Sequence, residues 1–389
     1  MKRTIRTIAI AATFLTATGI TLQSCGRDNE EYIIDNGGIS VDANNLKVTI
    51  KSGEVLTLDA SKTYNLTGPV IVENGGTLNI PAGTKINSTA GTNGYVLVAQ
   101  GGKININGTA TNPVVFTSPS QTPGDWGGIV ICGKAPINTG ATTASSEVGA
   151  SPYGGTDEND NSGSIRYLRI EYAGAIFNAE KEFNGLSLFG VGKGTTVEYV
   201  QVYASNDDGI EWFGGTVNSN YLIVNGADDD AFDWTEGWNG NGKYWYSNRF
   251  DNRGNRGIEA DNNSNNNSAS PFSNPTLSNI TLVGNTSGSE SQALKLRVGT
   301  KGKLDNVFLS NWSRGIDIQH DVTLGHITSG DLKLTNVNFE NVAQQSRGTN
   351  SAGTVVDVTG AFTVNTSATG AGNGSGVPDW AQGWTRDFK

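Results

Sequence analysis

Apolar and polar residues alternate in many short runs, and these runs recur along the chain. Asp-Gly-Ile-Glu-Trp at 208–212 is followed 22 residues later by Asp-Ala-Phe-Asp-Trp at 230–234. Related runs have apolar third residues at intervals of 24, 22, 26, 36 and 22: Leu186, Ile210, Phe232, Ile258, Leu294 and Ile316. Repeats of 20 to 50 residues are typical of solenoids and propellers. Unequal intervals with one long gap favour a solenoid with loop insertions.

The same pattern is present in the N-terminal half, where 70–80 matches 96–106 at an interval of 26 residues. Successive side chains of a strand point to opposite faces, so each coil buries its aliphatic residues and exposes its polar ones. We therefore predict an all-β chain, a parallel β-helix of about 22–26-residue coils over residues 45–389. Loop excursions are expected near 136–163, 235–256 and 262–274.

Two smaller features belong to the same prediction. Asn279, Asn306 and Asn336 fall at one turn of three later coils. Their amides either stack along the solenoid or serve as ordinary turn residues. The aromatic run 377–384 is expected to cover the last coil, since an uncovered coil leaves an open sheet edge.

The first residues form a targeting signal. Lys2, Arg3 and Arg6 precede an apolar stretch at 8–22 that is too short for a mature membrane span, and Cys25 follows. The pattern resembles a bacterial lipoprotein signal, with ordinary secretion as the alternative. We predict a signal peptide at 1–24 and a tether at 25–44 that is held to the membrane by lipid on Cys25. The acidic run after Cys25 resembles that of surface-exported Bacteroidetes lipoproteins, which predicts the outer membrane and the cell surface.

Charge narrows the classes of partner. The chain has 37 acidic and 27 basic residues and a formal net charge of −10. No basic stripe is present, which argues against nucleic acid and against electrostatic docking on anionic lipid. The only other cysteine, Cys132, has no partner for an internal disulfide once Cys25 is lipidated, and it is interpreted as a core residue.

Several motifs together resemble one family. They are Asp-Trp-Gly-Gly at 125–128, Tyr-Gly-Gly at 153–155, Arg-Ile-Glu-Tyr-Ala-Gly at 169–174 and Asp-Asp-Gly-Ile-Glu-Trp-Phe-Gly-Gly at 207–215. They are similar to motifs of secreted or lipid-anchored β-helix proteins from Bacteroidetes and marine bacteria. The resemblance covers nearly all of the chain after the leader. It implies a right-handed parallel β-helix of pectate-lyase-like fold, without an established activity.

The outward positions of the coils carry the candidate chemistry. If the apolar third residues point inward, the next residues point outward: Ser187, Glu211, Asp233, Glu259, Lys295 and Asp317. Asp261 and Arg297 lie two positions further on. Carboxylates about 5 Å apart repel by roughly 3 kcal/mol at an effective dielectric of 20. A bound cation, raised carboxyl pKa values, or Lys295 and Arg297 as partners can offset that repulsion.

Oxygen ligands with almost no His or Cys favour Ca²⁺ as the cofactor. The predicted metal ligands are Asp207, Asp208, Glu211, Asp230 and Asp233. The predicted ligand-binding set is Glu211, Asp233, Glu259, Asp261, Lys295, Arg297, Asp317, Trp238 and Trp245. The two tryptophans are expected either to stack on sugar rings or to pack over the coil edge.

Three functions remain open at this point. The first is a non-catalytic surface protein that binds an extracellular polysaccharide or another ligand. The second is a polysaccharide lyase or glycoside hydrolase, an analogy based on the fold shared with pectate lyases and polygalacturonases. Its catalytic candidates are Lys295 and Arg297 as bases, with Glu259 and Asp208 as carboxyl groups. The third is a structural scaffold with a solvated acidic face or structural Ca²⁺.

Overall fold

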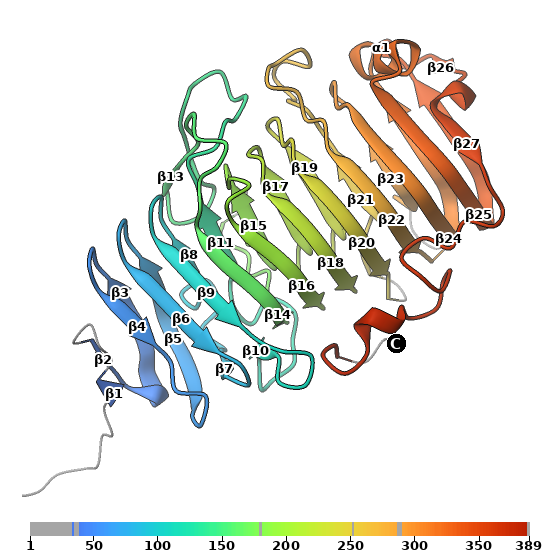
Figure 1. The fold of residues 1–389 in the computed structure, drawn as a ribbon. Coiled ribbons are helices and arrows are strands. Elements are labelled where there is room, and N and C mark those ends of the chain that lie inside the picture. Colours follow the sequence, from blue (N-terminus) through green and yellow to red (C-terminus); the bar gives the residue numbers. More distant parts are fainter. Residues whose placement is uncertain (1–32, 35–38, 179–180, 251–252, 286–289, 387–389) are drawn as a thin grey trace, which may run out of the picture. The chain divides into compact units, whose positions relative to one another are not determined.

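Parallel strands stack coil upon coil through most of the chain (Figure 1). The computed structural model describes residues 33–34, 39–178, 181–250, 253–285 and 290–386. Val70 pairs with Val96 in parallel, so the 26-residue interval is confirmed. The strands of these first coils are β3 Leu46–Ile50, β4 Val55–Thr57, β5 Thr63–Val72, β6 Thr77–Pro81, β7 Lys85–Asn87, β8 Val96–Val98, β9 Lys103–Asn107 and β10 Val114–Thr117.

The later coils each combine a short strand and a long strand. The short strands are β11 Ile129–Cys132, β15 Leu186–Phe189, β17 Ile210–Phe213, β19 Phe232–Thr235, β21 Ile258–Ala260 and β23 Gln292–Leu296. The long strands are β14 Gly163–Glu171, β16 Thr196–Tyr203, β18 Asn218–Asn225, β20 Asn241–Asn248 and β22 Thr276–Val283. In β24 Gly302–Gln319 and β25 Leu332–Thr349 both parts are continuous. The predicted alignment of Leu186, Ile210, Phe232, Ile258, Leu294 and Ile316 is confirmed.

Each long strand bends at a residue with a positive φ that occupies the same position in successive coils. This residue is a tyrosine in the middle coils and an asparagine in the later ones: Tyr167, Tyr199, Tyr221, Tyr244, Asn279, Asn306 and Asn336. The tyrosine rings stack, with the centroids of Tyr199 and Tyr221 4.4 Å apart. Asn306 donates to Asn279 at 2.8 Å, but Asn336 donates to Asp305. The predicted stacking is therefore confirmed for Asn279 and Asn306 and interrupted between Asn306 and Asn336, which instead accepts from Asn365 at 3.2 Å.

The interior of the coils is apolar and closed to solvent. Every predicted inward residue is inaccessible: Leu186, Leu188, Ile210, Trp212, Phe232, Trp234, Ile258, Ala260, Leu294, Leu296, Ile316 and Ile318. Trp238 and Trp245 are also fully buried, and their rings lie 4.8 and 4.9 Å from that of Trp212. Indole rings of this size dominate the energy of a core. Neither of the expected outcomes for Trp238 and Trp245, sugar stacking or edge packing, is therefore correct.

The predicted excursions are only partly correct. Residues 136–163 leave the stack, form an antiparallel pair of β12 Ala144–Ser145 with β13 Pro152–Tyr153, and bury outward side chains such as Phe189 and Phe213. Cys132 is buried in that same cluster rather than inside the coils. Residues 262–274 contain no strand, as expected. The excursion predicted at 235–256 is wrong, because β20 belongs to the sheet.

The N-terminal prediction falls mostly outside the described residues, which exclude 1–32 and therefore Cys25. β1 Ile33–Ile34 pairs in antiparallel fashion with β2 Ser40–Val41, and a 3₁₀ turn follows at Ala43–Asn45. Val41 is 5% exposed and packs in the main core. The tether predicted for 25–44 therefore ends before residue 44.

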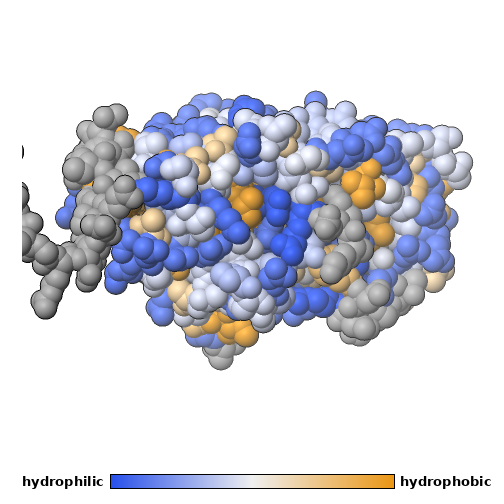
Figure 2. Space-filling view, turned by 90° about the horizontal axis from the view of Figure 1, so that it is seen from below, coloured by the Kyte–Doolittle hydropathy of each residue, from blue (hydrophilic) through white to orange (hydrophobic). Residues whose placement is uncertain are grey.

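The C-terminal region contains the helical elements. α1 Asp321–Ser329 joins β24 to β25, and β26 Val355–Val356, β27 Phe362–Val364 and 3₁₀ turns at Thr359–Ala361 and Asp379–Ala381 follow. No helix in the described part of the chain has the length and apolar character needed to cross a membrane. The face drawn in Figure 2 is mostly hydrophilic, with hydrophobic residues in small groups only.

Residues 370–386, the C-terminal strap, run back along the long strands (red in Figure 1). Ala371 donates to Thr281 at 2.9 Å, and the Arg386 backbone donates to Gln201 at 2.6 Å. The ring of Trp384 packs edge-on against Tyr167 and Tyr199. The C-terminal aromatics therefore cover the side of the solenoid, and the prediction that they cover the last coil is wrong.

Candidate functional site

The predicted outward row exists in the expected register. Glu211 pairs with Asp233, Asp233 with Glu259, Glu259 with Lys295, and Lys295 with Asp317. The row is more buried than a solvated face: Glu211 and Glu259 are 9% exposed and Asp317 is 2% exposed. Ionised groups at such positions need a partner or a changed protonation state.

One half of the row consists of carboxyl groups without basic partners. Ligand oxygens lie within 4.8 Å of one another in three groups: Asp207, Asp208 and Asp229; Asp208, Glu211 and Asp233; Asp230, Asp233 and Glu259. All five predicted metal ligands belong to these groups. Among the described residues, no basic side chain forms an ion pair with Asp208, Glu211 or Asp233, whereas Asp230 and Glu259 have such partners. We call Asp207, Asp208, Glu211 and Asp233 the unpaired group.

Hydrogen bonds satisfy only part of the unpaired group. Glu211 accepts from the Asn184 amide at 2.6 Å, and Asp208 accepts from the backbone N–H of Asp230 at 2.8 Å. Asp233 Oδ1 is buried and has no hydrogen-bond partner among the described residues. A buried oxygen without a donor is costly unless a proton or a cation reaches it.

Burial and mutual repulsion change the protonation of this group. Burial is the main cause that raises the pKa values of Asp208, Glu211 and Asp233 well above their ordinary range, and neighbouring carboxylates add to it. Burial also raises the pKa of Asp207 to about 8, with contributions from Glu182 and Asp229. Near neutral pH the unpaired group therefore retains protons or takes up a cation.

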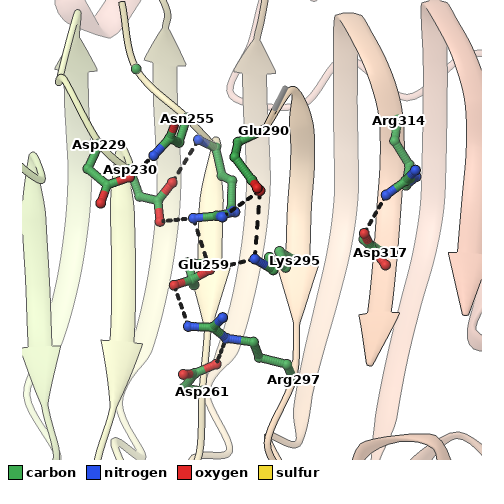
Figure 3. Close-up of polar contacts among 12 residues, drawn as sticks. Asp229, Asp230, Asn255, Glu259, Asp261, Glu290, Lys295, Arg297, Arg314 and Asp317 are labelled. Carbon is green, nitrogen blue, oxygen red and sulfur yellow. Dashed lines mark hydrogen bonds and ion pairs between the residues drawn. The ribbon is translucent and has the colours of Figure 1, made fainter. Parts of the chain in front are cut away.

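The other half of the row is fully ion-paired (Figure 3). Glu259 lies 3.0 Å from Arg256, 3.5 Å from Lys295 and 2.7 Å from Arg297. Arg297 also holds Asp261 at 2.8 Å. Burial raises the pKa of Asp230 to about 7 although Arg256 lies 3.1 Å away and acts to lower it.

The network also includes residues that the sequence reasoning missed. Glu290 lies 2.6 Å from Arg256 and 3.7 Å from Lys295, and Arg314 lies 2.5 Å from Asp317. Arg256 and Arg314 are the first residues of the five-residue runs, and that shared position was the signal available for them.

These contacts change the roles proposed for the catalytic candidates. The Lys295 side chain is 11% exposed, and its ammonium lies between two carboxylates. Arg297 is held by Glu259 and Asp261 at the same time. Neither side chain is presented as a free base, so the geometry does not support the lyase interpretation. Asp208, 6% exposed, remains next to other carboxyl groups.

Comparison with known proteins agrees with this architecture. Residues 48–385 match the family described as pectate-lyase-like β-helix domain. The chain belongs to this family. A crystal structure of the enzymatically active domain of bacteriophage CBA120 tailspike protein 2 is also similar, with 14% identity over 86% of this chain and 48% of that one and a TM-score of 0.26. The chain thus spans about half the length of that structure. A search of curated proteins gives no match.

In this pectate-lyase-like β-helix protein, the unpaired group fits a hard cation. Ca²⁺ takes six to eight oxygen ligands at about 2.3–2.6 Å, so two oxygens on one ion lie at most about 5 Å apart. The carboxylate oxygens of Asp208, Glu211 and Asp233 meet that limit. Asp233 Oδ1, buried without a hydrogen-bond donor among the described residues, could accept a cation or a proton.

Proposed function

We propose that this β-helix protein is a surface lipoprotein that binds an extracellular glycan along the outward row of β17, β19 and β21, with Ca²⁺ at the unpaired group. One observation carries the proposal. Glu259 is surrounded by cations. In the two preceding coils Asp208 and Glu211 are buried and Asp233 is half-buried, and no basic side chain of the described residues forms an ion pair with any of the three. A stable fold at neutral pH needs charge compensation there.

The ligand class follows from the chemistry of the row. Asp208, Glu211 and Asp233 would hold Ca²⁺, which would supply a positive charge with affinity for the hydroxyl or carboxylate oxygens of a sugar. Arg297, 30% exposed, and Asp261 supply further donors and acceptors at the end of the row. The pectate-lyase-like fold of the family is compatible with a polysaccharide ligand.

The location is proposed from the leader. The basic start, the apolar stretch and Cys25 support a lipid anchor, and the acidic run that follows supports export to the outer surface of the outer membrane. Labelling of cells with a fatty-acid analogue tests the anchor, because Cys25→Ala should abolish the label. Protease treatment of intact cells tests exposure, because a protein facing the periplasm would resist digestion.

Calcium titration tests the cation site. Calorimetry and thermal melting of the protein from residue 26 onward should show Ca²⁺ binding that raises the melting temperature. The Glu211→Gln/Asp233→Asn variant should lose both effects. Glu198→Gln should keep them, because Glu198 is a half-buried carboxylate on β16 that pairs with Arg166 and lies outside the unpaired group. A glycan array with and without Ca²⁺ then tests the ligand. If the parent and the Glu211→Gln/Asp233→Asn variant bind Ca²⁺ equally, the unpaired group is not the cation site.

A glycoside hydrolase is the second candidate, and the raised carboxyl pKa values favour it. A carboxyl that stays protonated near neutral pH can serve as general acid beside an ionised neighbour. Asp207, with a pKa of about 8, lies beside Asp208. Reducing-end release from a polysaccharide panel, compared with the Asp208→Asn variant, tests it. A structural scaffold would show neither turnover nor glycan binding.

A further inference from the structure

A second polar groove lies away from the acidic row, on the outward side of β7, β10 and β14. Its volume is about 430 Å³, within the range of small-ligand sites. The groove shares no lining residue with the unpaired group. The residues that matter here are Lys85, Asn87, Thr117, Arg169, Glu171 and Arg386.

Glu171 anchors two arginines at the groove. Its carboxylate is 1% exposed and accepts from the Thr117 hydroxyl at 2.7 Å, from Arg169 Nε at 2.8 Å and from Arg386 Nη1 at 2.8 Å. The Arg386 guanidinium also lies 4.8 Å from the ring centroid of Tyr203. The buried carboxylate therefore orients both guanidinium groups, and the Tyr203 ring also packs against that of Arg386, before any ligand arrives.

The groove is positively charged in an acidic protein. Lys85, Arg169 and Arg386 carry three positive charges against the one negative charge of Glu171, whereas the chain has a net charge of −10. Val115 pairs with Lys85 on one side and Arg169 on the other, so the two cations lie two coils apart, about 10 Å along the solenoid. A guanidinium has five N–H donors, so each arginine has donors beyond those that Glu171 uses.

We propose that this groove binds the carboxylate or sulfate group of an acidic sugar, with Arg169 and Arg386 on the anion and Lys85 on a neighbouring acidic unit. Planar guanidinium groups suit carboxylate and sulfate oxygens, and their pre-set orientation lowers the entropy cost of binding. The groove needs no Ca²⁺. It would bind an anionic group directly, whereas the proposed acidic row would bind a cation.

Calorimetry in EDTA tests the groove with three probes: a galacturonate trisaccharide, a neutral trisaccharide of equal length, and inorganic sulfate. We expect the acidic trisaccharide to bind, the neutral one not to bind, and salt to weaken the affinity. Lys85→Gln and Arg169→Gln should each weaken it about tenfold or more, since a charge-assisted hydrogen bond contributes about that much. Arg166→Gln is the matched control, because Arg166 lies exposed on the same strand, pairs with Glu198 at 2.5 Å and does not line the groove.

Each outcome decides the proposal. Lys85 is exposed, so Lys85→Gln remains informative even if Arg169→Gln disturbs the contacts of Glu171. Equal binding of the neutral trisaccharide, or full affinity in Lys85→Gln, would overturn it. If sulfate binds but the acidic trisaccharide does not, the groove is an anion site and the proposal of an acidic sugar as its ligand is wrong. Groove binding that persists in the Glu211→Gln/Asp233→Asn variant separates this inference from the proposed Ca²⁺ site.

Discussion

Replacing Glu211 with Gln should stabilise the Ca²⁺-free protein at pH 8. Its carboxylate lies within 4.8 Å of those of Asp208 and Asp233, and charges at that distance repel by about 3 kcal/mol at an effective dielectric of 20. Two such pairs give an upper limit of about 6 kcal/mol. The raised pKa values mean that proton uptake already relieves part of this repulsion, so we expect about 2–3 kcal/mol. The Gln amide oxygen can keep the hydrogen bond from Asn184.

Thermal melting measures the effect. With about 2.1 cal/mol/K of unfolding entropy per residue over some 350 residues, 1 kcal/mol shifts the melting temperature by about 1.4 °C. The variant should therefore melt about 3–4 °C above the parent without Ca²⁺. Ca²⁺ at a hundred times its dissociation constant should raise the free energy of unfolding of the parent by about 2.7 kcal/mol, which corresponds to a similar rise in melting temperature. The melting temperature of the variant should not change.

Asp317→Asn is the matched control within the same row. Asp317 is even less exposed than Glu211, but it has Arg314 at 2.5 Å, so neutralising its charge leaves a cation unpaired and should lower the melting temperature. Opposite signs for the two variants are the expected result. If Glu211→Gln lowers the melting temperature as Asp317→Asn does, charge repulsion does not dominate the unpaired group, and the argument for a cation there fails.

Three further predictions use the same chain. Without Ca²⁺ the melting temperature should fall as pH rises from about 4 to 8, because the pKa values of Asp207 and Asp230 rise from 3.8 to about 8 and 7 on folding. The folded state binds more protons in that window, so each carboxyl costs about 1.4 kcal/mol per pH unit, and a pH series of melts checks the sign. Arg297→Gln should cost about 1–3 kcal/mol in chemical denaturation, less than for a fully buried pair because Arg297 is 30% exposed. Trp245→Ala should cost about 3–5 kcal/mol and leave the glycan affinity of the folded protein unchanged, which melting and calorimetry together measure.

The strand register could be predicted from the sequence because it depends on a local rule. Side chains alternate with a period of two, so one anchored apolar residue, such as Ile210, fixes the face of Glu211 and its neighbours. Because the coils pair in parallel register, the residues aligned with Glu211, as far as Asp317, point to the same outward face. The clustering of Asp207 and Asp208 with Asp229 and Asp230 follows from the 22-residue repeat, which places these two pairs at the same turn of successive coils.

Burial of the row could not be predicted in that way. The excursion at 136–163 covers Phe189 and Phe213, the outward residues two positions beyond Ser187 and Glu211 of the row, and such a contact depends on where a long loop folds back. The error at Trp238 and Trp245 had a different origin. Tyr199, Tyr221 and Tyr244 recur at 22 and 23 residues, and that interval marks β20 as another long strand. The contacts of Arg386 at the end of the C-terminal strap join residues 185 and 215 positions apart, beyond any periodic signal.

The strap also bears on how the molecule is assembled. Coils of a solenoid can form in order as the chain is synthesised, since each needs only its neighbour. Residues 370–386 are made after every coil they contact, and Arg386 reaches back to Glu171. Closing so long a loop is slow relative to local stacking, so we expect the strap to dock last. The stacked tyrosines of the nascent protein would then remain exposed until synthesis is nearly complete. Once docked, the strap would contact early and late coils together, so these coils should unfold cooperatively.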